Sequence, residues 1–212
     1  MKPSIRLSFA LFCAALPLAA VAEALAWVQP DDVRVERLAE GIRIELEMNA
    51  PVTQVAAWRV LIDFDNMARF VPNLESSRVV FSQANTLKIE QRGTAHFGPF
   101  SQRFESVREI TLSPQREVAV RQLSGTARRM ESRMRLSPGG DGNTRLEYRA
   151  EIVPDMPIPP LFGPSFVRHE IAEQFTAMIN EMVRRQNLAK APTQPVTAPP
   201  ASPTPPPGSK GS

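Results

Sequence analysis

The stretch Trp58-Arg-Val-Leu-Ile-Asp-Phe-Asp-Asn-Met-Ala-Arg-Phe-Val-Pro-Asn-Leu74 decides the fold. Its apolar residues recur at helical spacing, which predicts an amphipathic helix. The Val71-Pro72 step ends that helix, because a proline pushes the preceding residue towards an extended conformation. The chain then continues as strands, and a second amphipathic helix follows near the C-terminus. Strands between two helical segments predict a curved sheet wrapped around a helix, which encloses an apolar cavity.

Alternating apolar and polar residues predict about six strands, one before this helix and five after it. In Ile42–Met48 the charged Arg43, Glu45 and Glu47 all fall on one face. Turn residues separate the strands at hairpin spacings and leave no room for crossover helices, so the sheet is expected to be antiparallel. The charged faces are expected to face solvent, with Arg and Glu paired across strands. The other predicted strands are Thr86–Phe97, Phe104–Leu112, Glu117–Leu123, Arg129–Leu136 and Thr144–Val153.

The C-terminal helix is predicted to begin near Pro160 to Pro164 and to end at about Leu188. Its apolar residues form one stripe, and Glu170 and Glu173 fall largely away from it. A long helix with one apolar stripe needs a sheet to lie on. The predicted fold class is therefore α+β, a helix-grip in which a curved antiparallel β-sheet wraps around a long C-terminal α-helix. The stripe consists of Phe166, Ile171, Phe175, Met178, Ile179 and Met182.

The two ends of the chain differ from the domain between them, residues 27–189. Residues 1–24 combine Lys2 and Arg6, an apolar stretch and small residues at Ala22 and Ala24, which predicts a cleaved signal peptide and a periplasmic or secreted protein. An uncleaved membrane anchor is the alternative. Residues 190–212 are rich in proline and lack apolar periodicity, which predicts a disordered spacer. A protein partner that recognises the prolines is the alternative for this tail.

Composition excludes several function classes. The only cysteine, Cys13, lies in the signal peptide, so the mature chain has no disulfide, no thiolate nucleophile and no Cys-ligated zinc. Two of the 25 Lys and Arg residues lie in the signal peptide and two in the tail, and one of the 22 acidic residues lies in the signal peptide. Residues 25–189 therefore carry 21 charges of each sign, which argues against a nucleic-acid partner.

Polar residues at inward strand positions are the best candidates for contacts with a ligand. Alternation places Gln91, Arg108, Gln122, Ser132 and Tyr148 on the inward face. A buried unpaired arginine is costly, so Arg108 needs either a carboxylate partner or a polar group of a ligand. The alternative is that Arg108 lies at the cavity mouth, or beyond a bulge that turns it outward.

Small and apolar residues complete the predicted cavity. Gly93 and Ala95 are small where the sheet faces the helix, which would leave volume for a ligand, although a glycine also marks a bend in a strand. Phe166, Phe175 and Met178 are expected to line the cavity from the helix. Methionines at such spacings also occur as plain core.

No metal, cofactor or catalytic residue is predicted. The His169-Glu170-Ile-Ala-Glu173 segment lacks the second histidine of a zinc helix, and His96 lies on a charged strand face. Ser-His-Asp, Cys-His and paired-carboxylate constellations are not evident in the sequence. Tyr148 and Arg108 could still orient and polarise a carbonyl group.

The segment from Asp63-Phe64 to Phe70-Val71-Pro72-Asn73-Leu74, followed by Gly93 to Phe104 and the final helix, resembles the START-like (SRPBCC) superfamily. Polyketide cyclase/dehydrase and coenzyme Q-binding proteins are the most similar groups within it. The resemblance implies a cavity for a lipid, quinone, isoprenoid or polyketide, often without catalysis. We therefore expect an exported binding or carrier protein whose partners are a hydrophobic small molecule and, transiently, a membrane. The alternatives are a cyclase or dehydratase-type enzyme using the same cavity, and an envelope protein-interaction module.

Overall fold

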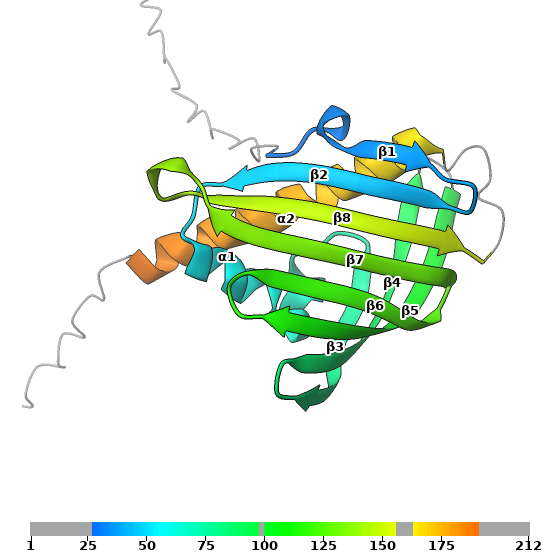
Figure 1. Cartoon of the computed structure of the whole chain (residues 1–212), viewed down its shortest axis with the longest axis horizontal. Coiled ribbons are helices and arrows are strands. Elements are labelled where there is room, and N and C mark those ends of the chain that lie inside the picture. The colour runs from blue at the N-terminus through cyan, green and yellow to red at the C-terminus, as the bar shows by residue number, and fades with distance from the viewer. Residues whose placement is uncertain (1–26, 98–99, 156–162, 191–212) are drawn as a thin grey trace, which may run out of the picture.

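Eight antiparallel strands form one curved sheet, where alternation alone predicted about six (Figure 1). The computed structural model describes residues 27–97, 100–155 and 163–190, so the predicted signal peptide and the proline-rich tail lie outside the described residues. The strand order is β1-β2-β8-β7-β6-β5-β4-β3. The strands are β1 (Arg34–Arg37), β2 (Ile42–Ala50), β3 (Leu74–Gln83), β4 (Thr86–Phe97), β5 (Phe100–Ser113), β6 (Glu117–Gly125), β7 (Ala127–Pro138) and β8 (Thr144–Pro154).

The two strands that alternation missed, β1 and β3, are the two edges of the sheet. β1 is four residues long, and Val35 is its only apolar residue. β3 shifts register against β4 between Leu74 and Ser76 and again between Val79 and Phe81. Each shift inserts an extra residue and moves the following side chains to the other face, which hides the alternation.

The opening stretch Trp58–Leu74 is not one helix, which corrects the first prediction. It divides into the end of α1 (Gln54–Leu61) and a 3-10 helix, η2 (Phe64–Arg69). The backbone leaves helical geometry at Asp63, with φ −84° and ψ 60°, and its carboxylate accepts a hydrogen bond from Asn66 Nδ2 at 2.8 Å. The α-helix therefore ends at Leu61, well before Pro72, and only the 3-10 helix η2 lies between them.

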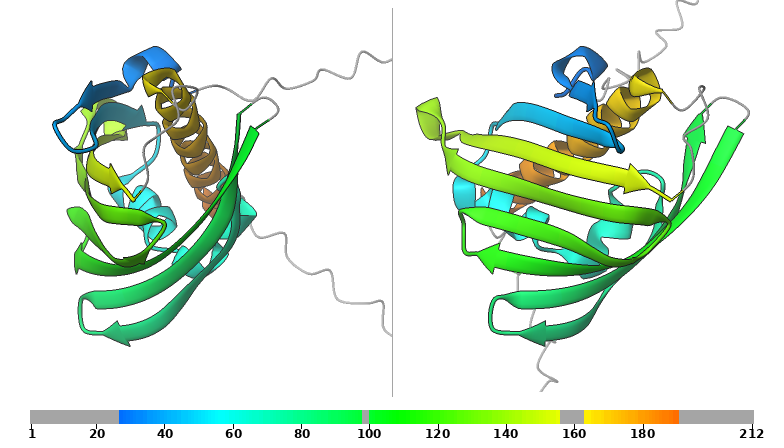
Figure 2. Two further views of the ribbon diagram at one scale, coloured as in Figure 1. Left: turned by 90° about the vertical axis from the view of Figure 1, so that its right-hand side faces the viewer. Right: turned by 45° about the vertical axis from the view of Figure 1, so that its right-hand side comes forward.

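The long helix α2 (Pro164–Lys190) lies across the concave face of the sheet, which confirms the predicted helix-grip (Figure 2). Its bounds agree with the predicted ones to within two residues at the C-terminal end. Among the described residues, no helix is both long and apolar enough to cross a membrane. The underside of α2 buries Ala172, Phe175, Met178, Ile179 and Met182 against sheet residues that include Ile44, Leu46, Ile89, Ile110 and Leu146.

The middle of α2 is tied to the first described residues of the chain. Trp27 Nε1 donates to Asn180 Oδ1 at 2.8 Å, and Val28 N donates to Thr176 Oγ1 at 3.1 Å. Two short 3-10 helices, η1 (Pro30–Asp32) and η3 (Gly140–Gly142), complete the described elements. The N-terminal segment thus acts as a clasp that holds α2 over the sheet.

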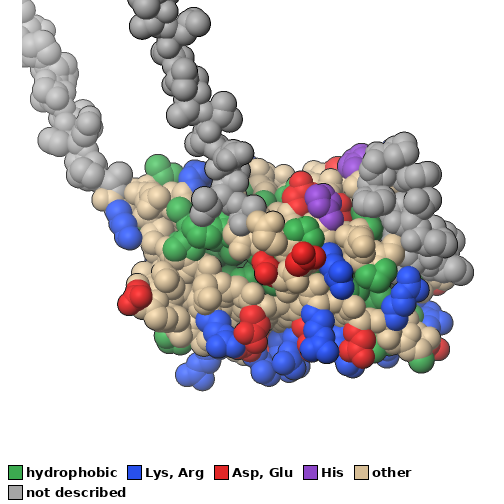
Figure 3. Space-filling model, turned by 90° about the horizontal axis from the view of Figure 1, so that it is seen from above, with side chains coloured by type: hydrophobic (Ala, Val, Ile, Leu, Met, Phe, Trp, Pro, Cys, Tyr) green, Lys and Arg blue, Asp and Glu red, His purple; other side chains and the backbone are tan. Residues whose placement is uncertain are grey.

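The outer face of the sheet carries the predicted ladder of charge pairs. Arg121 Nη2 lies 2.7 Å from Glu109 Oε1, and Arg135 Nε lies 2.9 Å from Glu117 Oε2. Basic and acidic side chains are intermixed along the surface in Figure 3. Because many of these charges pair with an opposite charge on the next strand, the two signs are interspersed over this face.

Candidate ligand-binding site

A cavity of about 180 Å³ lies between the concave face of the sheet, the turn from η2 to β3, and α2. Nine of its fourteen lining residues are apolar, and five polar residues converge on the same space, which is typical of a small-molecule site. The apolar residues are Phe64, Met67, Val71, Pro72, Leu74, Ile89, Phe104, Ile110 and Val120, and the polar residues are Asn73, Gln91, Arg108, Glu170 and Gln174.

Arg108 lines this cavity from β5, between Ile89 of β4 and Gln122 of β6. The register of β5 against β6 shifts beside it, but Arg108 faces inward, as alternation predicted. Its Nε is buried and has no hydrogen-bond partner, and no described carboxylate pairs with its guanidinium. Burial lowers the pKa of Arg108, and nearby Tyr148 acts in the opposite direction. The cavity therefore contains a cationic group whose desolvation the protein does not offset.

Tyr148 and Ser132 place two hydroxyl groups on the concave face near Arg108. The Tyr148 ring packs against Phe175 of α2, with 4.8 Å between ring centroids and a 60° interplanar angle. Burial raises the pKa of Tyr148, while Arg108 and a hydrogen bond with Ser132 act the other way. The phenol therefore stays protonated at neutral pH and serves as a hydrogen-bond donor.

Glu170 lines the cavity from α2, although its sequence position suggested that it faces away. Its Oε2 accepts a hydrogen bond from Asn73 Nδ2 at 2.9 Å. Burial raises the pKa of Glu170, and the Asn73 hydrogen bond partly counteracts this rise. The sequence carries a signal for this position: Glu170 and Gln174 are one turn apart and adjoin Ile171 and Phe175, at the margin of the apolar stripe.

Gln91 and Gly93 sit side by side on β4 but contribute differently. Gln91 lines the cavity, and its Nε2 already donates to Ser77 Oγ at 3.1 Å. Gly93 leaves no volume for a ligand, which corrects our expectation. A Cβ at this position would collide with the Asn73 carbonyl oxygen and lie 2.6 Å from Cζ of Phe104. The glycine is needed because two other segments approach its backbone closely.

The remaining predicted site residues do not line this cavity. Gln122 donates from Nε2 to the Ala127 carbonyl oxygen at 2.6 Å. Phe175 and Met178 are core residues with 3% and 4% exposure, so they are packed rather than open to a ligand. Phe166 is half-buried in the first turn of α2. Of the predicted residues, the structure therefore brings Gln91 and Arg108 to the cavity wall, with Ser132 and Tyr148 in the adjoining polar group.

Groups suited to a metal ion are not found in residues 27–97, 100–155 and 163–190: no three His, Cys, Asp or Glu side chains converge there. His96 and His169 are both exposed. The polar groups that line the cavity are a guanidinium, a carboxyl group and amides, and a phenol and a serine hydroxyl adjoin them.

A curved antiparallel sheet gripping a C-terminal helix defines a START-like helix-grip protein. Residues 48–179 match the family described as polyketide cyclase / dehydrase and lipid transport, and the chain belongs to this family. A search of curated proteins gave no match by sequence.

Solved structures with the same fold include proteins of different activities. A STAR-related lipid transfer protein from Xanthomonas axonopodis (fragment 25–204) is 14% identical, with a TM-score of 0.58 over 72% of this chain and 99% of that one. The Zhui aromatase/cyclase from Streptomyces sp. R1128 is 17% identical, with a TM-score of 0.56 over 70% and 97%. A START superfamily protein from Mycobacterium smegmatis is 12% identical, with a TM-score of 0.55 over 70% and 99%. At these identities the likeness shows the fold, and the family supports a role in binding hydrophobic ligands.

Proposed function

We propose that this protein binds and carries an amphipathic hydrophobic molecule, with the polar head group of the ligand at Arg108 and without chemical conversion. The observation that carries the proposal is the buried Arg108 Nε, which has no partner among the described residues although it lies at the wall of a cavity with both apolar and polar lining residues. A carbonyl, phenolate or carboxylate on the ligand would supply the missing acceptor. Lipids, quinones, isoprenoids and polyketide-like molecules all combine such a group with a large apolar surface.

The size of the cavity bears on how such a ligand enters. About 180 Å³ is smaller than the roughly 300–1,000 Å³ of pockets that enclose drug-sized molecules. The cavity as described holds the head group, so the apolar part requires α2 or the turn after η2 to move. We expect the movement in the N-terminal half of α2. The Asn73–Glu170 hydrogen bond holds that half, whereas the clasp at Trp27 and Val28 holds its middle.

Export belongs to the same proposal and rests on the sequence of residues 1–24. Cleavage after Ala22 or Ala24 would release a chain that begins shortly before the clasp. N-terminal sequencing of the protein from a cell-envelope fraction tests this step. A mature N-terminus at Glu23 or Leu25 would support export, and an intact Met1 on a cytosolic protein would contradict it.

Native mass spectrometry tests ligand binding directly. The full chain is expressed with its own N-terminus, purified from the envelope fraction and weighed intact. Bound material is then extracted into organic solvent and identified. We expect a stoichiometric amphipathic molecule on the wild type and on Arg121→Met, which alters an exposed arginine of the outer face. Arg108→Met should be recovered empty. An empty wild type that also fails to bind a dansylated fatty acid would refute the carrier function.

The second candidate, an enzyme of the cyclase or dehydratase type, is favoured by one observation: Glu170 and Arg108 line the same cavity. Glu170 could take a proton from the carbon beside a carbonyl group, while Arg108 donates a hydrogen bond to the resulting enolate oxygen. The raised pKa of Glu170, caused mainly by burial, suits such a base.

Deuterium exchange separates the two candidates without knowledge of the natural substrate. A long-chain β-keto thioester is incubated with the protein in deuterated water, and exchange at its α-carbon is followed by NMR. A carrier binds the probe and leaves the exchange rate at the solvent value. An enzyme accelerates exchange, and the acceleration disappears in Glu170→Gln although the probe is still bound.

A further inference from the structure

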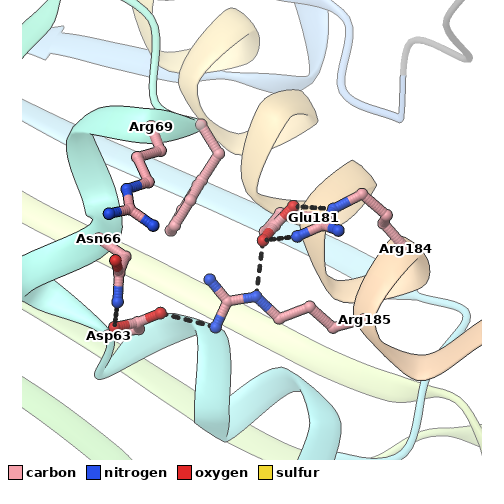
Figure 4. Close-up of a pocket in the computed structure, with 7 residues that line it drawn as sticks. Asp63, Asn66, Arg69, Glu181, Arg184 and Arg185 are labelled. Carbon is pink, nitrogen blue, oxygen red and sulfur yellow. Dashed lines mark hydrogen bonds and ion pairs between the residues drawn. The ribbon is translucent and has the colours of Figure 1, made fainter. Parts of the chain in front are cut away.

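A second pocket, distinct from the ligand cavity, lies where the C-terminal half of α2 meets α1 and η2 (Figure 4). Its volume is about 440 Å³. Arg69 contributes from the η2 side, and Arg184 and Arg185 contribute from α2. The other lining residues are Asp63, Asn66, Phe70 and Glu181.

Both carboxylates of this pocket are fully occupied by neighbouring side chains. Glu181 Oε2 lies 2.6 Å from Arg184 Nε, and Glu181 Oε1 accepts from Arg184 Nη2 at 2.7 Å and from Arg185 Nε at 2.6 Å. Asp63 Oδ2 lies 2.7 Å from Arg185 Nη1, and its Oδ1 accepts from Asn66 Nδ2 at 2.8 Å. The hydrogen bond from Arg184 lowers the pKa of Glu181, and the bond from Arg185 adds to this effect against the opposing influence of burial. The two carboxylates thus hold the guanidinium groups of Arg184 and Arg185 in place.

Several guanidinium N–H groups of the pocket remain available. Within the described part of the chain, Arg69 has no ion pair, and neither Arg184 Nη1 nor Arg185 Nη2 has a hydrogen-bond partner. Arg185 also stacks over the Phe70 ring, with 5.4 Å from its Cζ to the ring centroid. Three arginines against two carboxylates leave the lining with a net charge of +1. The pocket thus presents oriented donors from two sides and an excess of positive charge.

We propose that the pocket formed by Arg69, Arg184 and Arg185 binds a phosphate group. Arginine binds phosphate through paired N–H groups, and three guanidinium groups on two sides suit a tetrahedral oxyanion better than a planar carboxylate with two oxygens. A volume of about 440 Å³ leaves room for a substituent such as glycerol or a sugar. The phosphate can belong to a lipid head group or to a soluble molecule, and both sources share this chemistry.

Titration with inorganic phosphate by calorimetry, on the full-length protein, tests the site. Arg69→Gln is the decisive variant because Arg69 is exposed and holds no other described residue, so the substitution should leave the fold intact. We expect it to weaken phosphate binding roughly tenfold, the loss of a charge-assisted hydrogen bond. Arg59→Gln, an exposed arginine of α1 outside the pocket, should bind like the wild type.

Co-sedimentation with vesicles distinguishes the two sources. Binding to vesicles containing phosphatidylglycerol, but not to pure phosphatidylcholine, and its loss in Arg69→Gln would identify a lipid head group. Phosphate binding without vesicle binding would identify a soluble phosphate. Absence of both, or binding that Arg69→Gln leaves unchanged, would overturn the proposal. Arg108→Met should not affect either assay, so this site and the cavity succeed or fail separately.

Discussion

Arginine side chains on the two faces of the sheet lie in opposite environments. On the outer face, Arg121 pairs with Glu109 at 2.7 Å and Arg43 with Glu151 at 2.9 Å. On the concave face Arg108 has no described carboxylate partner, and its Nε is buried without a hydrogen bond. Exposed pairs contribute little to stability, whereas an unpaired buried cation costs free energy. This contrast supports our proposal that Arg108 serves ligand binding rather than folding.

The helix α2 repeats this contrast between its two ends. Glu181, near the C-terminal end, is held by Arg184 and Arg185, and these contacts lower its pKa. Glu170, near the N-terminal end, has the neutral Asn73 as its hydrogen-bond donor, and burial raises its pKa. The acidic residue near the C-terminal end of α2 is therefore paired with cations, whereas the acidic residue beside the cavity has only a neutral hydrogen-bond donor.

The largest expected effect on the free energy of unfolding is at a buried residue of β5, compared with its exposed neighbour on the other face. Ile110 is completely buried on the concave face, and Thr111 is exposed on the outer face. Ile110→Ala should lower the free energy of unfolding by about 2–5 kcal/mol, because it removes buried methyl groups and leaves a cavity. Thr111→Ala should change it by less than about 0.5 kcal/mol. Urea denaturation measures both, and equal losses would contradict the assignment of the two faces.

Removing the paired charge on α2 should have the next largest effect. Glu181→Gln should cost about 2 kcal/mol at neutral pH, since it weakens charge-assisted hydrogen bonds to two arginines. The folded state lowers the pKa of Glu181, so its contribution is present above the ordinary value of 4.5 and is lost as the pH falls through the lower folded value. Denaturation curves of wild type and variant should therefore converge in acid. A constant difference at every pH would show that ionisation is not the cause.

Arg108→Met should act in the opposite direction and stabilise the unliganded protein by about 1–2 kcal/mol. The substitution keeps an apolar side chain of similar length and removes a cation that the fold leaves unpaired. Differential scanning calorimetry measures the effect, with Arg121→Met as the control for an exposed arginine, whose melting temperature should stay near that of the wild type. A lower melting temperature for Arg108→Met would mean that the guanidinium has a stabilising partner in the free protein.

The smallest effect is expected at Glu170. Burial raises its folded pKa, so the folded state binds the proton more tightly and ionisation at higher pH costs stability. Glu170→Gln should therefore stabilise the protein at neutral pH by less than about 1 kcal/mol, after allowance for solvent screening, and the gain should vanish at low pH. Thermal melts at pH 4 and pH 8 check the sign. A larger gain at the lower pH would contradict a raised pKa.

Local patterns were enough to predict most of the sheet and the orientation of Arg108. Strand alternation depends on the chain itself, so the inward side of Arg108, Ser132 and Tyr148 could be read from neighbouring residues. The helical pattern places Glu170 only at the margin of the apolar stripe, and whether a residue there is buried depends on the segments packed beside the helix. The predicted role of Gly93 was wrong for the same reason, because its neighbours Asn73 and Phe104 come from a turn and from another strand. The break at Asp63 is a change of backbone conformation within a run that keeps its apolar spacing, so periodicity does not reveal it.

The order of strands in the sheet has a consequence for how the chain folds. β2 is followed in the chain by α1 and six further strands, yet apart from the short β1 its only partner is β8, the last strand. The clasp joins Val28 to Thr176, 148 positions later. Such distant pairings form slowly, because closing a long loop costs conformational entropy before any contact between its ends can stabilise it. The sheet therefore cannot be completed until nearly all of the polypeptide has been made. For the export that we propose, this delay would leave β2 and β8 unpaired while the chain is threaded through a translocation channel.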